Sequence, residues 1–400
     1  MSPAPPPKRD WPPRSVRPAR FRSSLRLPRL TPPLQILHYR ANPTMTDSAL
    51  FCWCRAGFEP ELAAELNERA AVAGHPGYAR TERNSGYVEF MVEDAAALSR
   101  ALPWSKLIFA RQKLVRLADL RGLQASDRIA PMLAALEAIA GSGLNVSMFG
   151  ELWVEHPDSD AGKPLAGLAR SFGNALRPAL RKAGWLSRED DPRRPRLHVA
   201  FLAGDHAVLA MSDPHDSSPW PLGIPRLRMH PDAPSRSALK LEEALLTLLD
   251  ADERERRVRD NMQAADLGAA PGGWTWVLMR NGMKVTSVDN GPLRQALLDS
   301  GRVDHLRADG FSWQPKRSLD WMVCDMVEQP VRVAERMATW FREGWCRQAI
   351  FNLKLPMKKR WEETRLCLET FEYQAHRPLI VRARQLYHDR EEITVFAAPK

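Results

Sequence analysis

The chain has 400 residues, of which 44% are hydrophobic and 26% are charged, and its formal net charge is +10. This length can supply two or three domains, and no apolar run reaches the roughly 18 residues of a membrane-spanning helix. Five cysteines without C-x-x-C spacing, and histidines without H-x-x-x-H spacing, favour a reduced, cytoplasmic compartment and no metal site.

Residues 1–44 differ in composition from the rest of the chain. They hold 11 of the 33 prolines and nine Lys or Arg against one Asp, so only +2 of the net charge belongs to the remaining residues. Such a segment buries too little apolar surface to offset its chain entropy. We predict a disordered extension. It is a basic RNA-contacting arm, a targeting peptide, or sequence upstream of a start at Met45, and the globular pattern that begins at Met45 favours the last.

Residues 45–105 have the pattern of a small α+β module. ALFCWC, residues 49–54, reads as a buried strand, and residues 60–73 read as a helix with Glu61 near its positive end. SGYVEFMV, residues 85–92, alternates as a strand does, and residues 94–100 suggest a second short helix. This order predicts a ferredoxin-like module.

Residues 106–230 have a mixed pattern that ends in a proline-rich connection at 213–234. The predicted strands are 107–117, 151–156 and 197–204, and the predicted helices are 127–139 and 165–186. The second helix is amphipathic and interrupted at Pro178. Its polar side carries Arg170, Arg177, Arg181 and Lys182, which form either a solvated face or a phosphate-contacting face.

From residue 231 to residue 400 helices alternate with strands. The first helix is SALKLEEALLTLL, which Ser235 or Ser237 can cap. The predicted strands are 265–267, 284–288, 305–307, 321–324, 349–353, 380–385 and 393–396. This alternation predicts an open, mostly parallel, doubly wound sheet, and the short turn between the last two strands predicts an antiparallel hairpin at its edge.

A glycine-rich turn follows the first strand of this sheet. It reads DLGAAPGG, from Asp266 to Gly273, rather than the G-x-G-x-x-G of dinucleotide-binding proteins. Closely spaced glycines before a helix let a ligand approach the backbone and the free N–H groups of the helix. Asp289 ends the second strand 21 residues after Gly268, a spacing at which a carboxylate can hold ribose hydroxyls.

Three aspartates end successive strands, namely Asp289, Asp309 and Asp325. Ligands of such sheets bind at the carboxyl ends of the strands, so these positions predict a ligand crevice there. Asp266 at the start of the turn and the carboxylates at the rim favour a positively charged ligand that carries ribose hydroxyls. S-adenosylmethionine has both properties, and the protein then has to orient the acceptor and remove its proton.

Lys354, Lys240 and Glu392 are candidates for proton transfer. Lys354 ends the apolar strand in FNLKLP, where partial burial is expected to lower its pKa toward that of a base. Lys240 lies on the helix before the glycine-rich turn, and Glu392 begins the last strand. Taken singly, each is better explained as an ordinary surface or edge residue.

Five motifs in order resemble the FtsJ-type RNA ribose 2′-O-methyltransferases: SRSALKL, DLGAAPGGW, CDM, NLKLP and REEIT. The resemblance covers residues 235–400. It implies a Rossmann-like fold and S-adenosylmethionine as cofactor. It also implies a catalytic tetrad of Lys240, Asp325, Lys354 and Glu392, in which Lys354 accepts the proton of the ribose 2′-hydroxyl. Asp325 and Glu392 are then expected to steer Lys354, and Lys240 to position the ribose or polarise its oxygen.

Further motifs extend the resemblance from about Met45 to Thr394, among them RAGFEPELAAEL, NSGYVEF, GIPRLR and ARQLYHDREE. They are similar to bacterial large-subunit rRNA methyltransferases that modify the 2′-oxygen of one cytidine in the peptidyl-transferase region of 23S rRNA. That family implies a THUMP-type RNA-binding half at 106–230, a catalytic half at 231–400, and 23S rRNA as the partner of a monomeric enzyme. The implied cofactor contacts are Ser237, Ala270, Pro271, Gly272, Gly273, Asp289 at the ribose, Asp309 near the adenine, and Asp325.

The same resemblance leads us to expect that Lys358, Lys359 and Arg360 contact phosphates. Three alternatives remain open at this point: methylation of another structured RNA, methylation of a base, and a non-catalytic RNA-binding assembly factor. An exocyclic-amine enzyme is expected to carry an Asn/Asp-Pro-Pro-aromatic loop where this chain has CDMVEQP. A cytosine carbon-5 enzyme is expected to carry a Pro-Cys nucleophile, whereas Cys324 follows Val323 inside a predicted strand.

Overall fold

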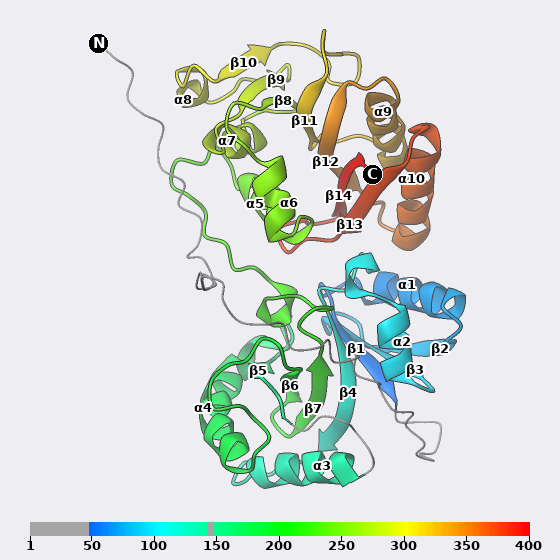
Figure 1. The fold of residues 1–400 in the computed structure, drawn as a ribbon, viewed down its shortest axis with the longest axis vertical. Helices are drawn as coiled ribbons and strands as arrows, with labels where there is room; N and C mark the ends of the chain where they lie inside the picture. Colours follow the sequence, from blue (N-terminus) through cyan, green and yellow to red (C-terminus); the bar gives the residue numbers. More distant parts are fainter. Residues whose placement is uncertain (1–47, 142–147) are drawn as a thin grey trace, which may run out of the picture.

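The computed structural model describes residues 48–141 and 148–400. The predicted extension at 1–44 lies outside these residues. The described chain forms two seven-stranded sheets, each with its own helices, which follow one another along the long axis of the molecule (Figure 1). Among the described residues, no helix is long and apolar enough to span a bilayer.

The N-terminal sheet has the strand order β2-β3-β1-β4-β7-β6-β5, and every neighbouring pair is antiparallel except β5 with β6. Its strands are β1 Ala49–Trp53, β2 Gly77–Thr81, β3 Tyr87–Val92, β4 Gln112–Arg121, β5 Glu151–Glu155, β6 Arg196–Ala203 and β7 His206–Ser212. Its helices are α1 Glu59–Val72, α2 Ala95–Ala101, α3 Ile129–Gly141 and α4 Ala166–Lys182, with short 3-10 turns η1 Trp104–Lys106, η2 Lys163–Leu165 and η3 Pro221–Gly223.

Strand β4 joins the two segments that the sequence divides at residue 105. Its first residues pair with β1, and the stretch from Val115 to Arg121 pairs with β7. One sheet therefore runs through residues 48–212 without a break. The predicted domain boundary at residue 105 therefore falls inside one continuous sheet, and whether 45–105 and 106–230 are separate domains stays a prediction.

Several expected elements of this half differ from the structure. The strand predicted at 107–117 begins only at Gln112, because residues 107–110 are buried in the contact with the other half instead. Strands β2 and β7 were not predicted; most of β2 is exposed and therefore has no apolar alternation. The break expected at Pro178 does not occur, since α4 continues through this exposed proline.

The C-terminal sheet has the order β10-β9-β8-β11-β12-β14-β13. Its strands are β8 Gln263–Leu267, β9 Lys284–Val288, β10 Val303–Leu306, β11 Leu319–Cys324, β12 Cys346–Lys354, β13 Leu379–Arg384 and β14 Glu392–Pro399. Its helices are α5 Ala238–Thr247, α6 Ala251–Arg257, α7 Gly273–Arg280, α8 Gln295–Leu298, α9 Pro330–Arg342 and α10 Arg360–Gln374.

This second sheet confirms the predicted Rossmann-like α/β class. Strands β8 to β12 are mutually parallel, and β14 runs antiparallel to both β12 and β13. The predicted edge hairpin is therefore confirmed, with β13 outermost. Since β14 inserts beside β12, residues at the start of β14 lie next to residues at the end of β12.

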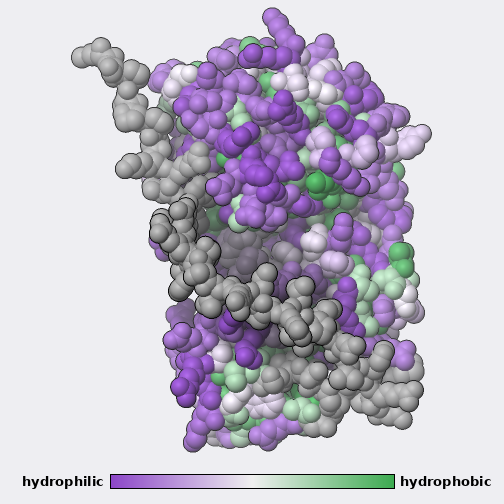
Figure 2. All heavy atoms as spheres, viewed as in Figure 1, coloured by the Kyte–Doolittle hydropathy of each residue, from purple (hydrophilic) through white to green (hydrophobic). Residues whose placement is uncertain are grey.

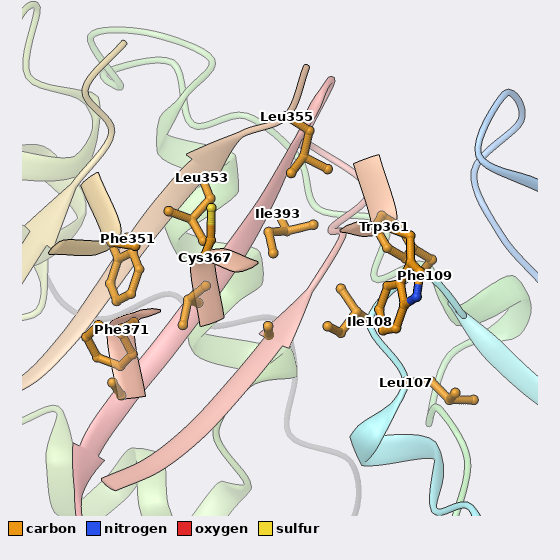
Figure 3. Close-up of a cluster of buried hydrophobic side chains, with 14 of the residues drawn as sticks. Leu107, Ile108, Phe109, Phe351, Leu353, Leu355, Trp361, Cys367, Phe371 and Ile393 are labelled. Atoms are coloured by element: carbon orange, nitrogen blue, oxygen red, sulfur yellow. The ribbon is translucent and has the colours of Figure 1, made fainter. Parts of the chain in front are cut away.

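The two halves share part of one hydrophobic core. Leu107, Ile108 and Phe109, from the segment before β4, are buried in the same cluster as Trp361 of α10 and Ile393 of β14 (Figure 3). The rings of Phe109 and Trp361 meet edge to face with centroids 6.3 Å apart. Fully burying a side chain such as Phe contributes about 1.5–3 kcal/mol, so this contact stabilises the docking of the two halves.

Polar contacts reinforce the junction between the halves. Arg384 of β13 is buried, stacks 3.8 Å from the ring centroid of Trp104, and donates to the carbonyl oxygens of Ala110 and Trp104. Arg360 of α10 pairs with Glu61 of α1 and with Glu391. The expectation that Arg360 contacts phosphate is wrong, because its guanidinium is committed to these carboxylates.

One face of the molecule can be seen in Figure 2. The face in Figure 2 is mainly hydrophilic, and its apolar side chains lie scattered among polar ones. All five cysteines are buried free thiols in the described part of the chain.

Candidate active site

The carboxyl ends of the parallel strands bring several loops of the C-terminal half together around the glycine-rich turn. A Cβ atom added to Gly268 meets Met326 Cγ at 2.6 Å, and one added to Gly310 meets the Met326 sulfur at 2.9 Å. The loops after β8, β10 and β11 are thus in close contact. These contacts gather the segments that are predicted to line the ligand crevice, and the crevice itself stays a prediction.

Asp289, at the end of β9, ties the turn to the second strand. Its Oδ2 accepts a hydrogen bond from Ala270 N at 2.9 Å, and its Oδ1 accepts one from Gly291 N at 2.7 Å. An ionised carboxylate has about four acceptor sites, so each oxygen keeps capacity for a further donor. This half-buried carboxylate fits a ligand that presents hydroxyl groups.

Ser237 and the helix α5 pack against the turn from the other side. A Cβ atom on Gly273 would lie 2.3 Å from Ser237 Oγ and 2.5 Å from Ser235 Oγ, so only glycine fits there. The two serine hydroxyls bond each other at 2.7 Å. Ser237 occupies the N-cap position of α5, but its side chain makes no capping bond there, which differs from the expected role.

Pro271 and Asp309 occupy the outer parts of the predicted contact set. The Pro271 carbonyl accepts a hydrogen bond from Arg294 N at 3.2 Å, which anchors the turn to the segment before α8. Asp309 is exposed after β10, and its Oδ1 accepts from Phe311 N at 3.0 Å within its own tight turn. Gly310 is the residue that brings Asp309 close to the glycine-rich turn.

Asp266, whose charge at the start of the turn favoured a positively charged ligand in the sequence interpretation, is buried. It is 1% exposed at the end of β8 and accepts a hydrogen bond from Thr275 Oγ1 at 2.6 Å. Burial raises its pKa to about 7, although the bonds from Thr275 act in the opposite direction. Asp266 therefore holds the first turn of α7 through Thr275, and it gives no evidence about the charge of a ligand.

The tetrad assembles as a closed ring of alternating charges. Lys354 Nζ contacts both Asp325 Oδ1 and Glu392 Oε2. Lys240 Nζ contacts Glu392 Oε1 and lies 3.4 Å from Asp325 Oδ2. The structure thus brings together four side chains from α5, the end of β12, the start of β14 and the loop after β11, although Lys240 and Glu392 are 152 residues apart in the sequence.

The register of the sheet explains why these four residues meet. Lys354 and Glu392 are directly opposite in the antiparallel pair β12–β14. Asp325 follows β11, whose last residue Cys324 pairs with Phe351 of β12. Directly opposed residues have Cβ atoms about 4.5–5.5 Å apart, so the ion pairs form without long side-chain reach.

Lys354 carries a raised pKa, contrary to the expectation that burial lowers it. Burial does act to lower the pKa, but the negative charges of Asp325 and Glu392 and the hydrogen bonds to them outweigh it. The ammonium form of Lys354 is therefore the resting form. A proton must leave this group before its nitrogen can accept another.

The sequence interpretation gave no role to three buried polar residues that adjoin the tetrad. Asn352 Nδ2 donates to Asp325 Oδ1 at 3.0 Å, and Thr394 Oγ1 donates to Asn352 Oδ1 at 2.7 Å. Asp389 lies within hydrogen-bonding distance of Thr394. The sequence could have indicated Asn352 and Thr394, because each lies two residues from a tetrad member on the same strand and therefore on the same face of the sheet.

The loops after β11 and β12 border the tetrad with exposed side chains. Val327, two residues after Asp325, is 89% exposed, and Met357, three residues after Lys354, is 79% exposed. Lys358 and Lys359 beside Met357 are exposed as well. Exposed apolar side chains and positive charge therefore lie in the two loops that follow Asp325 and Lys354.

Cys324 at the end of β11 bears on the base-methylation alternative. It is fully buried, and burial raises the pKa of its thiol to about 12. A thiolate nucleophile needs a lowered pKa and access to the substrate. Cys324 has neither, which counts against attack on a cytosine ring by this residue.

Comparison with known proteins places this chain in a family. Three family models match successive parts of the chain: the RlmM ferredoxin-like domain at 47–114, the N-terminal region of ribosomal RNA large subunit methyltransferase M at 127–213, and the FtsJ-like methyltransferase at 233–377. The ribosomal RNA large subunit methyltransferase M of Xanthomonas oryzae pv. oryzae is 70% identical over 350 residues, which are 88% of this chain and 99% of that protein. The chain belongs to the ribosomal RNA large subunit methyltransferase M family.

A second relative agrees with this membership in the ribosomal RNA large subunit methyltransferase M family. The protein of that name from Xanthomonas axonopodis pv. citri is 69% identical over the same shares of both chains. The chain is therefore a methyltransferase. Among solved structures, TrmN from Thermus thermophilus covers 88% of this chain and 99% of its own at 15% identity, with a TM-score of 0.31, and the assignment does not rest on it.

Proposed function

We propose that this enzyme transfers a methyl group from S-adenosylmethionine to the ribose 2′-hydroxyl of one specific cytidine in 23S ribosomal RNA, with Lys354 as the proton acceptor. The observation that carries the proposal is the closed ring of Lys240, Asp325, Lys354 and Glu392 beside the glycine-rich turn. The names of the relatives, which specify ribosomal RNA of the large subunit, support the substrate class.

The residues around the turn suit S-adenosylmethionine. We assign its binding to Ser237, the segment from Ala270 to Gly273, Asp289, Asp309 and Asp325. When bound, this cofactor supplies a methyl group that is already activated for transfer. The unused acceptor sites of Asp289 suit the ribose of the cofactor, and the start of α7 suits its polar groups.

The task of the tetrad is then to bind the acceptor ribose and to take its proton. A ribose hydroxyl is a weak acid, so a base has to be held within hydrogen-bonding reach of it. Asp325 and Glu392 hold the Lys354 nitrogen at a fixed point by two contacts. Lys240, held by the same two carboxylates, is placed to position the ribose or to polarise its oxygen.

The surface near the tetrad suits RNA rather than a small molecule. Lys358 and Lys359 can pair with phosphates, which positions a nucleic acid without reading its sequence. Val327 and Met357 offer exposed apolar surface to a splayed-out base, as single-stranded RNA recognition requires. We assign the choice of cytidine to RNA shape read by both halves, which share one hydrophobic cluster.

We further propose that the reaction takes place in the cytoplasm and that the enzyme acts as a monomer. The free thiols of all five cysteines, which lie in the described part of the chain, suit a reducing compartment. The proposed cofactor-binding residues and the tetrad all come from a single chain.

The proposal is tested with Lys354→Ala in methyl transfer from labelled S-adenosylmethionine to a 23S rRNA transcript. We expect transfer to be abolished, while calorimetry still detects cofactor binding. Lys284→Ala is the matched control, because Lys284 is an exposed lysine at the opposite end of the sheet, where β9 begins. Transfer by Lys354→Ala at the rate of the control would eliminate Lys354 as the proton acceptor.

A further inference from the structure

A second layer of polar side chains lies directly beneath the tetrad. Asn352 and Thr394 face each other in the pair β12–β14, just as Lys354 and Glu392 do two residues away. Residues two apart on a strand point to the same side of the sheet. Both Asn352 and Thr394 are 0% exposed, so their hydrogen bonds are made within the protein.

These side chains form one continuous line of hydrogen bonds from Asp325 to Asp389. Asn352 Nδ2 lies 3.0 Å from Asp325 Oδ1, and Asn352 Oδ1 lies 2.7 Å from Thr394 Oγ1. Thr394 Oγ1 lies 3.0 Å from Asp389 Oδ2 and 3.2 Å from Asp389 Oδ1. Leu386 N donates to Asp389 Oδ2 at 3.0 Å and closes the line.

A count of protons sets the direction of this line. The amide of Asn352 must present its N–H to the Asp325 carboxylate, so its oxygen faces Thr394 and needs a donor. The Thr394 hydroxyl has one proton, which that oxygen uses. The contact between Thr394 and Asp389 then lacks a proton unless Asp389 supplies it. Because Asp389 Oδ2 already accepts from Leu386 N, we place that proton on Oδ1.

The surroundings of Asp389 favour a neutral acid. It is 1% exposed, and burial together with the charge of Glu392 on β14 raises its pKa well above the usual value. Glu243 on α5 acts in the same direction, whereas the Leu386 N–H and Lys240 on α5 act against it. Arg55, from the N-terminal half, also interacts with Asp389 by charge.

We propose that Asp389 is a positioning residue that works as a neutral carboxylic acid. Its O–H orients the Thr394 hydroxyl, which orients the Asn352 amide, which holds Asp325 facing the two lysines. An ionised Asp389 competes for the Thr394 proton and releases the amide. The catalytic consequence rests on the proposed function, whereas the protonation state of Asp389 does not.

The role of Asp389 is tested with three variants in single-turnover methyl transfer to a 23S rRNA transcript. Asp389→Asn keeps the shape, a donor for Thr394 and an acceptor for Leu386 N, so we expect a rate within about twofold of wild type. Asp389→Ala and Thr394→Val break the line, and we expect each rate to fall by about tenfold or more. If Asp389→Asn is as slow as Asp389→Ala, the negative charge is required and the proposal is overturned.

A spectroscopic measurement separates this proposal from the assignment of the reaction. Infrared difference spectra of wild type against Asp389→Asn at pH 7, without RNA, should contain the carbonyl band of a protonated carboxyl group in wild type. A difference that contains only carboxylate bands would refute the neutral acid, whatever the RNA substrate is. Melting temperatures identify a variant that fails to fold, and in that case the infrared result on Asp389→Asn decides alone.

Discussion

The raised pKa of Lys354 makes a strong prediction about the pH dependence of methyl transfer. The ordinary lysine pKa is 10.5, and the two carboxylates raise it further. At pH 7.5 fewer than about one Lys354 in a thousand is neutral, a cost of at least ~4 kcal/mol on the reaction. If neutral Lys354 takes the proton, the single-turnover rate should rise about tenfold for each pH unit between pH 7 and pH 9.

Glu392→Gln perturbs this profile in a defined direction. A nearby negative charge favours the charged form of lysine, so its removal lowers the pKa of Lys354 and raises the neutral fraction at every pH below that pKa. One opposite charge at this distance changes a pKa by about 1–3 units. The rising limb of the rate profile should therefore move to lower pH by about that amount, even if the maximal rate of the variant is reduced.

The assay is a quenched single-turnover measurement with enzyme in excess over a 23S rRNA transcript, at cofactor saturation for each pH. Binding of RNA and of S-adenosylmethionine is measured at the same pH values, so that a change in affinity is not mistaken for a change in the chemical step. A flat wild-type profile from pH 7 to pH 9 would refute proton acceptance by Lys354. If the rising part of the pH–rate profile moves to higher pH in Glu392→Gln, the Glu392 charge does not raise the pKa of Lys354 and the prediction is refuted.

Three further predictions concern the cofactor, stability and the junction between the halves. Asp289→Ala should weaken S-adenosylmethionine binding, measured by calorimetry, and an unchanged affinity removes Asp289 from the site. Folding raises the pKa of Asp266 to about 7, so the stability that its neutral form provides is lost as the pH rises through 7. Between pH 5 and pH 8, the free energy of unfolding should therefore fall by about 3 kcal/mol more in wild type than in Asp266→Asn. Equal pH dependence of the two proteins in urea unfolding would contradict this. Arg360→Met leaves Glu61 without its partner and should cost about 3 kcal/mol in the same assay, whereas a cost near zero means that the ion pair does not stabilise the junction.

Much of the catalytic half could be predicted from the sequence because its signals are local. Each strand there is a short apolar run, and the carboxyl ends of parallel strands must meet, so Asp289 and Asp325 could be placed near the glycine-rich turn. The tetrad needed the resemblance as well. Lys240 and Glu392, taken singly, are ordinary in their own segments, and only the packing of α5 and the register of β14 bring them together.

The remaining errors have physical causes that no local pattern reveals. Residues 107–110 have the composition of a strand, but their apolar side chains are buried against α10. The charge of Asp266 was used as evidence about the ligand, but the burial of this side chain depends on how α7 packs on β8, which the local sequence does not reveal. The pKa of Lys354 depends on two carboxylates from distant segments, and Arg360 is paired with Glu61, 299 residues away.

The most direct test of the proposed reaction uses 23S rRNA from cells that lack this protein. The purified enzyme and S-adenosylmethionine are added, and the RNA is then cleaved in alkali, which requires a free 2′-hydroxyl at each cleaved linkage. We predict that a single cytidine becomes resistant to cleavage and that Lys354→Ala leaves it sensitive. Methyl incorporation without any new resistant position, or incorporation into a base, would contradict ribose methylation by this enzyme.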